Sequence, residues 1–490
     1  MFEFESAKDI KFSELYYFCS KKVGRKKRLP VFEKVPIEDV AAEGKSIARV
    51  EGQVIFVTKA LPGDVVDLKI TRKKKSYMEG IPLAFHRYSE KRVEPFCRHF
   101  DVCGGCKWQD LPYREQIRYK RRQVVDNLER IAKVELPGIN DILPSYHTRY
   151  YRNKMEFSFA DHRWLTREEI ERGDEHLEKR GLGLHIPGRW DKIVDIEHCH
   201  LQPDPSNAIR NTIRDFAISR DYPFFNLRRN EGFLRNLIIR TSSSGGVMVI
   251  VIFFRDEPDM RKALMDHILE HFPGLTSLMY MINPKANDSI YDLEARLYAG
   301  SSFIYEEMEG LSFKIGPKSF YQTNSHQAHE LYRLVRSYAG LKGDELVYDL
   351  YTGTGTIANF LAPHCGKVVG IESVPEAIED ARENARLNGI TNTAFVSGDM
   401  KDLLNEEFMD RHGRPRVIVT DPPRAGMHKD VVASILKAAP RTIVYVSCNP
   451  ATQARDVGML AESYRLSEVQ PVDMFPHTYH VENVILLSRK

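Results

Sequence analysis

The sequence lacks two features of proteins that enter or cross membranes. It contains no apolar run of 18 residues, so we expect no membrane-spanning helix and no membrane partner. Its first 20 residues carry Glu3, Glu5 and Asp9, without a positively charged start followed by an apolar stretch, which argues against a secretory signal.

Cysteine and net charge are also scarce. Seven cysteines in 490 residues, an odd number, do not indicate a disulfide framework, and a reducing cytoplasm fits. The net charge of +3 excludes a polycation. Basic residues instead gather in three short clusters, which are Lys21–Arg28, Arg72–Lys75 and Arg118–Arg122. Most basic clusters are solvated surface, but three within the first 122 residues favour a phosphate-rich partner.

The length allows about three domains, each with its own core. We expect residues 1–23 to be a poorly ordered extension and residues 24–88 to hold about five short strands, which predict a small barrel of the OB type. The expected strands are Val31–Val40, Ser46–Val50, Gln53–Val57 and Asp64–Ile70. The lysine-rich turn at Arg72–Lys75 favours contact with RNA, and a spacer barrel without a ligand is the alternative.

Residues 89–325 mix strands and helices and predict an α+β central domain that includes a basic helix over Tyr113–Ala132. From 326 to 490, helix and strand alternate regularly. The expected strands are 345–351, 367–372, 393–399, 416–421 and 443–448. This series predicts an α/β domain with a doubly wound parallel sheet, which binds ligands at the carboxyl ends of its strands.

A glycine-rich turn, Asp349–Thr356, follows the first of these strands and lets a ligand approach the backbone. The next strand ends in Glu372, where an acid can accept hydrogen bonds from both ribose hydroxyls, and the third leads to Asp399, near the expected adenine. A dehydrogenase that binds NAD would share such an acid. The dinucleotide fingerprint requires a third glycine, however, where this chain has Ala358, so the pattern favours S-adenosylmethionine.

The last of these strands runs into Ser447-Cys448-Asn449-Pro450. A free cysteine is commonly a small buried apolar residue, but Asn449-Pro450 forces a sharp loop at the ligand-binding edge. Uracil C5 is too weak a nucleophile to attack a sulfonium methyl group, whereas a thiolate added to C6 makes an enolate that can. A base must then remove the C5 proton; Glu482 is the candidate, and a solvated loop acid is the alternative.

Four further cysteines form a ligand pattern. They are Cys97, Cys103, Cys106 and Cys199. Four thiolates hold either a tetrahedral zinc ion or a [4Fe–4S] cluster, and the spacing does not separate the two. The pattern is not the CxxxCxxC of radical enzymes. The two remaining cysteines, Cys19 and Cys365, are interpreted as structural or incidental.

Over about residues 28–490 the chain resembles the RNA 5-methyluridine methyltransferases, in particular the iron–sulfur enzymes that methylate uracil C5 in 23S rRNA. The resemblance rests on Ser319–Asn324, the glycine turn, Glu372, Asp421–Arg424, Ser447–Pro450 and His480–Glu482. It implies a Rossmann-like S-adenosylmethionine-dependent domain, a TRAM-type RNA-binding barrel, and a [4Fe–4S] cluster held by the four cysteines. It implies Cys448 as the nucleophile and Glu482 as the base. The implied cofactor contacts are Gln322, Tyr351, Glu372 and Asp421, with Asp399 a weaker candidate.

One residue departs from this family, and two rival families can be compared with the same motifs. Thr356 stands where relatives often have asparagine, so no cofactor contact is carried over there. RNA cytosine-C5 methyltransferases place a second cysteine directly after the motif proline, where this chain has Arg424. Amino-group methyltransferases use Asp/Asn-Pro-Pro followed by an aromatic residue, and need no cysteine. Neither rival explains Cys448 together with Glu482.

The sequence therefore predicts a cytoplasmic, monomeric enzyme that methylates C5 of a uridine in structured RNA from S-adenosylmethionine. The target is expected to be 23S rRNA, with tRNA the alternative, and the base must leave its stack to react. A hypothesis from another class is a non-catalytic RNA-binding or assembly factor. The intact Cys448, Glu482 and glycine turn argue against it.

Overall fold

The computed structural model describes residues 29–490. The expected extension 1–23, the basic cluster Lys21–Arg28 and Cys19 therefore lie outside the described residues. No helix in the described part of the chain is long and apolar enough to cross a membrane.

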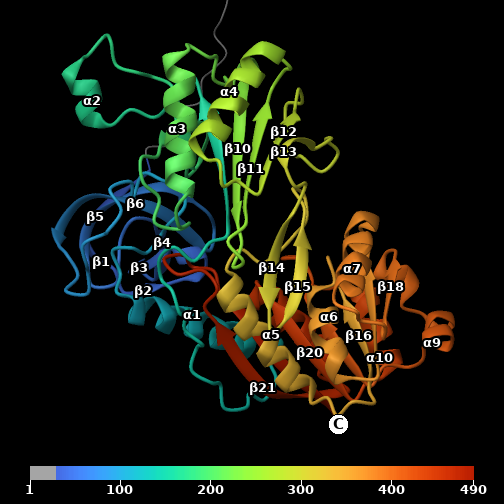
Figure 1. Cartoon of the computed structure of the whole chain (residues 1–490). Coiled ribbons are helices and arrows are strands. Elements are labelled where there is room, and N and C mark those ends of the chain that lie inside the picture. Colours follow the sequence, from blue (N-terminus) through green and yellow to red (C-terminus); the bar gives the residue numbers. More distant parts are fainter. Residues whose placement is uncertain (1–28) are drawn as a thin grey trace, which may run out of the picture. The chain divides into compact units, whose positions relative to one another are not determined.

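The described residues fall into two compact units, which are described separately (Figure 1). The first comprises the residues up to Asp39 together with Lys45–Ser89. The second comprises Val40–Gly44 and Glu90–Lys490.

The N-terminal sheet has six strands in the order β1-β5-β6-β4-β3-β2, one more than the five or so expected. They are β1 (Val31–Pro36), β2 (Asp39–Val40), β3 (Ser46–Val50), β4 (Gln53–Val57), β5 (Val65–Lys73) and β6 (Tyr77–Arg87), with a 3₁₀ turn at Ala42–Gly44. Alternate residues such as Ile55, Val66 and Leu68 are fully buried, because successive side chains of a strand point to opposite faces. The turn around Arg72–Lys75 is exposed at the junction of β5 and β6.

The second unit begins with the cysteine-containing loop and a helix. The predicted helix over Tyr113–Ala132 is confirmed as α1 (Tyr113–Asn127), which continues into a π-helical turn, η2 (Leu128–Ala132). Its buried face carries Gln116, Lys120 and Val124, four residues apart and therefore one above another on the helix. Two of these three side chains are polar, so they require partners inside the protein.

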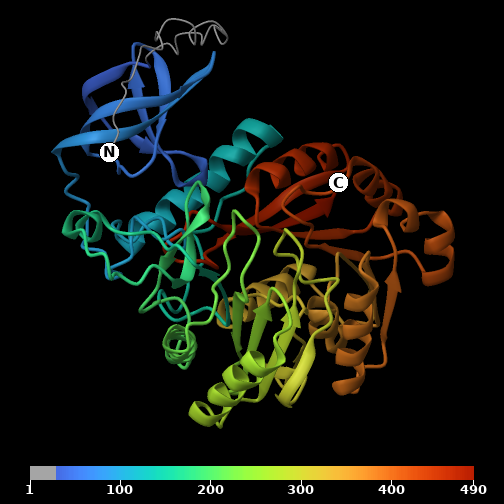
Figure 2. The same cartoon turned by 90° about the horizontal axis from the view of Figure 1, so that it is seen from above.

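A mixed sheet of seven strands follows, in the order β13-β12-β11-β10-β7-β8-β9. The strands are β7 (Lys154–Ala160), β8 (Gly181–Ile186), β9 (Arg189–Asp195), β10 (Leu234–Thr241), β11 (Val247–Phe253), β12 (Ser277–Ile282) and β13 (Arg296–Gly300). Helices α3 (Ser206–Ser219) and α4 (Pro258–His271) pack on one face of this sheet (Figures 1 and 2), while the short α2 spans Arg167–Arg172. A hairpin of β14 (Ile304–Met308) and β15 (Leu311–Ile315) then leads to the last sheet.

The C-terminal sheet also has seven strands, in the order β18-β17-β16-β19-β20-β22-β21, of which the first five are parallel. The strands are β16 (Leu346–Leu350), β17 (Lys367–Glu372), β18 (Thr393–Ser397), β19 (Val417–Thr420), β20 (Thr442–Ser447), β21 (Tyr464–Val472) and β22 (Glu482–Arg489). The five predicted parallel strands are confirmed within two residues at each end.

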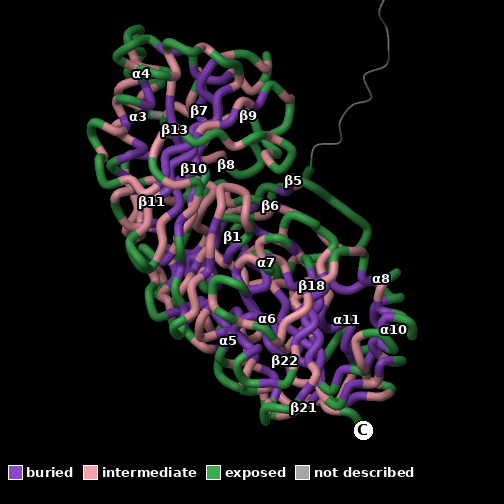
Figure 3. The backbone as a smooth tube through the Cα atoms, turned by 45° about the vertical axis from the view of Figure 1, so that its right-hand side comes forward, coloured by how far each residue is buried: buried purple, intermediate pink, exposed green. Residues whose placement is uncertain are grey.

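Helices cover both faces of this sheet. Side chains of α5 (Ser325–Ala339), α6 (Thr356–Leu361) and α7 (Pro375–Leu387) join the core on one face, and those of α1, α10 (Lys429–Ala438) and α11 (Pro450–Leu460) join the core on the other. The remaining helices are short: η3 (Ala362–His364), α8 (Met400–Leu403) and α9 (Glu406–His412). In Figure 3 the buried residues follow the strands, as expected for a sheet covered on both faces.

Candidate active site

The pairing of β20 with β22 brings the candidate nucleophile and the candidate base together. Ser447 pairs with Asn483 in the antiparallel register, so the next residue, Cys448, comes opposite Glu482 at the carboxyl end of β20. Glu482 is the first residue of β22 and only 5% exposed, which removes the alternative of a solvated loop acid. A thiol and a carboxyl group thus face one another at the edge where such sheets bind ligands.

Two more acids lie near this pair. Asp421 follows β19, and Asp349 lies in the neighbouring strand β16, where Thr352 Oγ1 donates a hydrogen bond of 2.5 Å to its Oδ2. Burial, together with the charge of Asp421, raises the pKa of Glu482 to about 8. Burial likewise raises the pKa values of Asp421 and Asp349 to about 7. A cluster of this kind favours a cationic ligand, because a nearby positive charge stabilises the ionised carboxylates.

Arg424 adds a positive charge to this site. Burial and the neighbouring acids Glu482 and Asp421 raise the pKa of the Cys448 thiol to about 11, and the positive charge of Arg424 opposes this rise. Asn449 accepts a hydrogen bond from Ala451 N (3.1 Å) at the start of α11 and donates one to Arg424 O (2.9 Å). The sequence analysis used Arg424 only to exclude a rival; its position directly after Asp-Pro-Pro was the signal that could have identified it.

The glycine turn and Glu372 come together as predicted. Glu372, at the end of β17, accepts a hydrogen bond from Gly353 N (3.2 Å). Gly355 has a φ of +74°, and a Cβ there would come 2.7 Å from the Cβ of Ala381, so only glycine fits. Tyr351, half-buried, also has a positive φ of 63°. The turn is therefore held close to the end of β17.

Asp399 has a local role instead. It is exposed, accepts a hydrogen bond from Lys401 N (3.1 Å) as the N-cap of α8, and pairs with Lys401 Nζ at 3.1 Å. Beside the glycine turn, Tyr351 and Pro423 help to line an open cavity of about 520 Å³.

The segment that carries Gln322 connects the two sheets of this unit. Gln322 O accepts a hydrogen bond from Asn153 Nδ2 (2.9 Å), just before β7. Asn324 caps α5 by accepting from Gln327 N (3.2 Å) and donates to Met474 O (2.9 Å). The motif Ser319–Asn324 is thus attached both to the central sheet and to the segment that leads to Glu482.

The chain is similar to known RNA methyltransferases. Residues 299–490 match the family model described as tRNA (Uracil-5-)-methyltransferase, and residues 33–83 match the TRAM domain. An RNA methyltransferase of Bacteroides thetaiotaomicron is 59% identical over 92% of this chain and 100% of its own length. One from Porphyromonas gingivalis is 56% identical over 92% of this chain and 99% of its own.

A solved structure agrees. The tRNA (uracil-54, C5)-methyltransferase of Pyrococcus abyssi, in complex with S-adenosyl-L-homocysteine, has a TM-score of 0.72 and 30% identity, over 93% of this chain and 100% of its own.

The chain belongs to the RNA (uracil-5-)-methyltransferase family. It is therefore an enzyme that uses S-adenosylmethionine to methylate uracil at C5 in RNA, which confirms the predicted enzyme class, methyl donor and kind of partner. The expected TRAM domain is confirmed as well, over residues 33–83.

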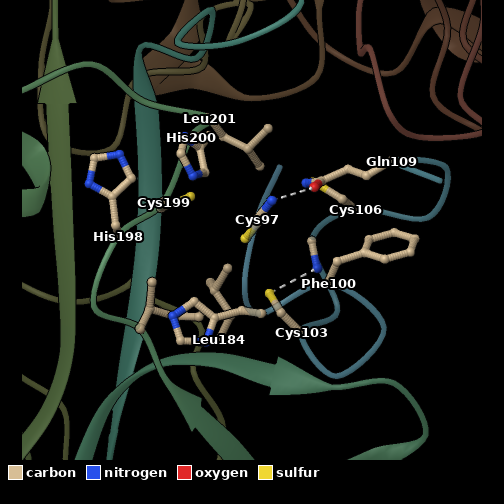
Figure 4. Close-up of a pocket in the computed structure, with 13 residues that line it drawn as sticks. Cys97, Phe100, Cys103, Cys106, Gln109, Leu184, His198, Cys199, His200 and Leu201 are labelled. Atoms are coloured by element: carbon tan, nitrogen blue, oxygen red, sulfur yellow. Dashed lines mark hydrogen bonds between the residues drawn. The ribbon is translucent and has the colours of Figure 1, made fainter. Parts of the chain in front are cut away.

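The four cysteines of the ligand pattern line one small cavity of this family member, about 20 Å³ in volume (Figure 4). Three come from the loop before α1, and Cys199 comes from the segment between β9 and α3. Within residues 29–490, the one group that brings three candidate ligand atoms within 4.8 Å of one another is His267, Glu270 and His271, so no three of the cysteine sulfurs are that close. Around a single zinc ion they would lie about 3.8 Å apart, because Zn–S bonds are about 2.3 Å long.

Buried polar residues that the sequence analysis missed link the cysteine loop to the active site. Gln116 donates to Trp108 O and Leu111 O (2.8 Å each), and its Oε1 accepts from His477 N at 2.9 Å. The backbone N–H of Lys107, directly after Cys106, donates to His477 O at 2.7 Å. The segment five residues before Glu482 is therefore hydrogen-bonded directly to the cysteine loop.

Lys120 anchors the same segment from the next turn of α1. Its ammonium group donates to Asp473 Oδ1 at 2.6 Å and to Phe475 O at 3.0 Å, and both charged side chains are 0% exposed. The available signal was a glutamine and a lysine four residues apart on the helix face that also carries Val124. Cys365 is buried in the core of the C-terminal sheet, in agreement with a structural interpretation.

Proposed function

We propose that the protein transfers a methyl group from S-adenosylmethionine to C5 of a specific uridine in 23S rRNA through a covalent adduct of Cys448 with C6. The register that sets Cys448 opposite Glu482 carries this proposal. We further propose that it acts as a monomer in the cytoplasm, with domains over 24–88, 89–325 and 326–490.

In the proposed reaction the uridine leaves its stack and enters the site. Arg424 favours the thiolate of Cys448, which adds to C6 and moves the C5=C6 electron pair toward C5. S-adenosylmethionine supplies the methyl group that C5 accepts. Glu482 then takes the C5 proton, the double bond forms again, and the bond between Cys448 and C6 breaks.

The cofactor contacts proposed are Gln322, Tyr351, Glu372 and Asp421, with Asp399 the weaker candidate because Lys401 already pairs with it. Raised pKa values at Asp349, Asp421 and Glu482 support a cationic donor. The sulfonium of S-adenosylmethionine is positive, whereas the product S-adenosylhomocysteine has lost that charge. The same acids would therefore bind the donor more tightly than the product.

A [4Fe–4S] cluster with Cys97, Cys103, Cys106 and Cys199 as ligands is proposed for the cysteine cavity. Four thiol donors around one cavity fit such a cluster. The separation of the sulfur atoms is wider than a single zinc ion requires, which favours a centre with several metal ions. Such a centre would tie segments about 100 residues apart and support the loop that contacts His477. We expect anaerobically purified protein to contain about four irons; stoichiometric zinc without iron would refute the assignment.

The choice of 23S rRNA over tRNA rests on the resemblance of the cysteine pattern and barrel to the rRNA enzymes. The Pyrococcus abyssi relative, which is named as a tRNA enzyme, favours tRNA as the second candidate. Mapping 5-methyluridine in both RNAs from a deletion strain decides between them. Loss of the modification from tRNA alone would refute the rRNA assignment.

The mechanism is tested with Glu482→Gln. Thiolate addition and methyl attack do not need this carboxylate, whereas removal of the C5 proton does, so a methylated RNA–protein adduct should accumulate. With the methyl group of the donor labelled, the label should migrate with the protein in a denaturing gel. If a single-turnover experiment showed neither methyl transfer nor an adduct, Glu482 would instead have a binding role. Ordinary turnover would mean that another group is the base.

A further inference from the structure

A second polar pocket, of about 150 Å³, lies on the central sheet, on the face opposite to α3 and α4. Alternate residues of three adjacent strands line it: Lys154 and Glu156 of β7, Asn236, Ile238 and Arg240 of β10, and Ile252 of β11. The residues between them face the core under α3 and α4. Segments 288–291 and 317–320 complete its wall.

Two cations stand side by side in this pocket. Lys154 and Arg240 are directly opposite each other in the antiparallel pairing of β7 with β10, an arrangement that destabilises a sheet when the charges have the same sign. Arg240 is only 6% exposed, and its guanidinium donates to Ser319 O at 2.7 Å. Its Nε has no hydrogen-bond partner among the residues that the structure describes. Burial and Arg240 lower the pKa of Lys154, as expected for a lysine that lacks sufficient negative charge nearby.

The other charged groups of the lining compensate only part of this positive charge. Glu156 Oε1 lies 3.2 Å from Lys154 Nζ, but Asp288 already pairs with the buried Arg235 at 3.0 Å. Lys318 adds a third cation, whose Nζ donates to the backbone carbonyls of Tyr291 (3.0 Å) and Leu293 (2.9 Å). Lys154, Arg240 and Lys318 stand against Glu156, the one carboxylate of the lining that is not paired outside it, so two positive charges are in excess, which suits an anion.

An aromatic ring stands at the same pocket. Tyr291 lines it and is 75% exposed. Burial of an aromatic side chain is favourable, so an exposed tyrosine gains free energy when a ligand covers its ring. Unstacked RNA bases bind by stacking on exposed aromatic rings, while their phosphates bind cations. A phosphate site beside an exposed ring therefore fits one nucleotide.

We propose that this pocket binds one nucleotide of the RNA substrate other than the target uridine, with its phosphate at Lys154 and Arg240 and its base stacked on Tyr291. This inference rests on the proposed function, since it assumes a single-stranded RNA segment at the active site. Arg240 connects the two sites, because it holds Ser319 at the start of the motif that carries Gln322. The pocket would thus select the sequence or shape next to the target uridine.

The test measures RNA affinity against salt concentration. The probe is a fluorescein-labelled, uridine-containing single-stranded RNA of about ten nucleotides, with anisotropy read between about 50 and 300 mM KCl. Lys154→Gln should weaken binding and reduce the slope of log K against log salt by about 0.7, the value for one phosphate contact on a single strand. Tyr291→Ala should weaken binding about 5- to 150-fold with the slope unchanged. Arg240 is left intact because it supports the backbone of the cofactor motif.

Matched controls lie on other surfaces of the same sheet and its helices. Lys262→Gln on α4 removes a more exposed cation, which also pairs with a carboxylate, and Trp190→Ala on β9 removes a similarly exposed ring. Both changes should leave affinity and slope unchanged. Calorimetric affinity for S-adenosylmethionine should stay within about twofold of wild type in all four variants.

Unchanged RNA affinity and slope in Lys154→Gln and Tyr291→Ala would overturn the inference. If Lys154→Gln lowered affinity for S-adenosylmethionine but not for RNA, the pocket would belong to the methyl donor. If it abolished binding of inorganic phosphate alone, with RNA binding intact, the site would be a free-phosphate site. Methyl transfer by the wild type to ribosomal RNA is measured separately: binding without methylation would refute the proposed function and leave the pocket standing.

Discussion

Replacing Lys120 by methionine should destabilise the Glu90–Lys490 unit by about 3 kcal/mol. The ammonium group is fully buried and makes a 2.6 Å ion pair with Asp473 and a 3.0 Å hydrogen bond with Phe475 O. Removing one partner of a buried pair leaves an uncompensated charge, at a cost of about 3–5 kcal/mol. We expect the lower end, because Tyr113 OH (2.7 Å) and Phe475 N (3.2 Å) still donate to Asp473.

The measurement is the free energy of unfolding in urea. A loss of about 3 kcal/mol is a large part of the ~5–15 kcal/mol typical of a folded domain. Arg130→Met is the control: Arg130 lies just after α1 and pairs with Asp126 at 3.4 Å, but its side chain is 76% exposed, so the change should cost less than about 0.5 kcal/mol.

A double variant separates charge from packing. Lys120→Met combined with Asp473→Leu removes both charges, and apolar replacements of a buried ion pair are often neutral, so it should recover at least half of the loss. A single variant within about 0.5 kcal/mol of wild type would refute the argument. So would a double variant no more stable than the single one, because the cost would then not come from an unpaired charge.

The active site supports three more predictions. Cys448→Ala should abolish methyl transfer, measured as turnover, while the affinity for S-adenosylmethionine, measured by calorimetry, stays within about threefold of wild type. Activity within about tenfold of wild type would exclude the covalent mechanism. Affinity for S-adenosylmethionine should rise from pH 6 to 8, because the acids with raised pKa values must lose protons beside the sulfonium. Calorimetry in buffers of different ionisation heat should show that S-adenosylmethionine releases protons on binding and that S-adenosylhomocysteine does not. Binding of S-adenosylmethionine without proton release would contradict this. Without ligand, the same acids contribute stability that is fully present below about pH 4 and is lost progressively between about pH 4 and pH 8, so the urea midpoint should fall across that range. A midpoint that rose there would contradict the raised pKa values.

The parallel strands of the C-terminal sheet were predictable because each is a short apolar run that ends at a turn or a polar residue. Because these strands are covered on both faces, their sequences need no alternation of apolar and polar residues. Their predicted and observed ends agree within two residues. The strand β6 (Tyr77–Arg87) was not predicted as a separate element. It mixes Met78 and Gly80, which are buried, with exposed residues such as Leu83, so its local pattern is weak. It forms because it pairs with both β5 and β4, which is long-range information.

The active site shows the same division between local and long-range information. Cys448 and Glu482 could be identified as candidates from their residue types and from family resemblance, but their apposition depends on the pairing of β20 with β22. Asp399 is the last residue of a predicted strand, yet Lys401 two residues later gives its carboxylate a local partner. The link between Lys120 and Asp473 spans 353 residues, and no local pattern predicts a contact of that kind.

These long-range contacts meet on the segment Asp473–Glu482, which makes the position of the base depend on most of the second unit. Lys120 and Gln116 of α1 bind this segment at Asp473 and at the N–H of His477. The N–H of Lys107 in the cysteine loop donates to His477 O. Asn324 of the cofactor motif donates to Met474 O. His477 has a positive φ of 63°, a conformation that a non-glycine residue keeps only when its surroundings enforce it. Since C5 proton removal needs a carboxylate within hydrogen-bond reach, damage to the cysteine loop should reach catalysis through this segment, although no cysteine of that loop takes part in the proposed methyl transfer.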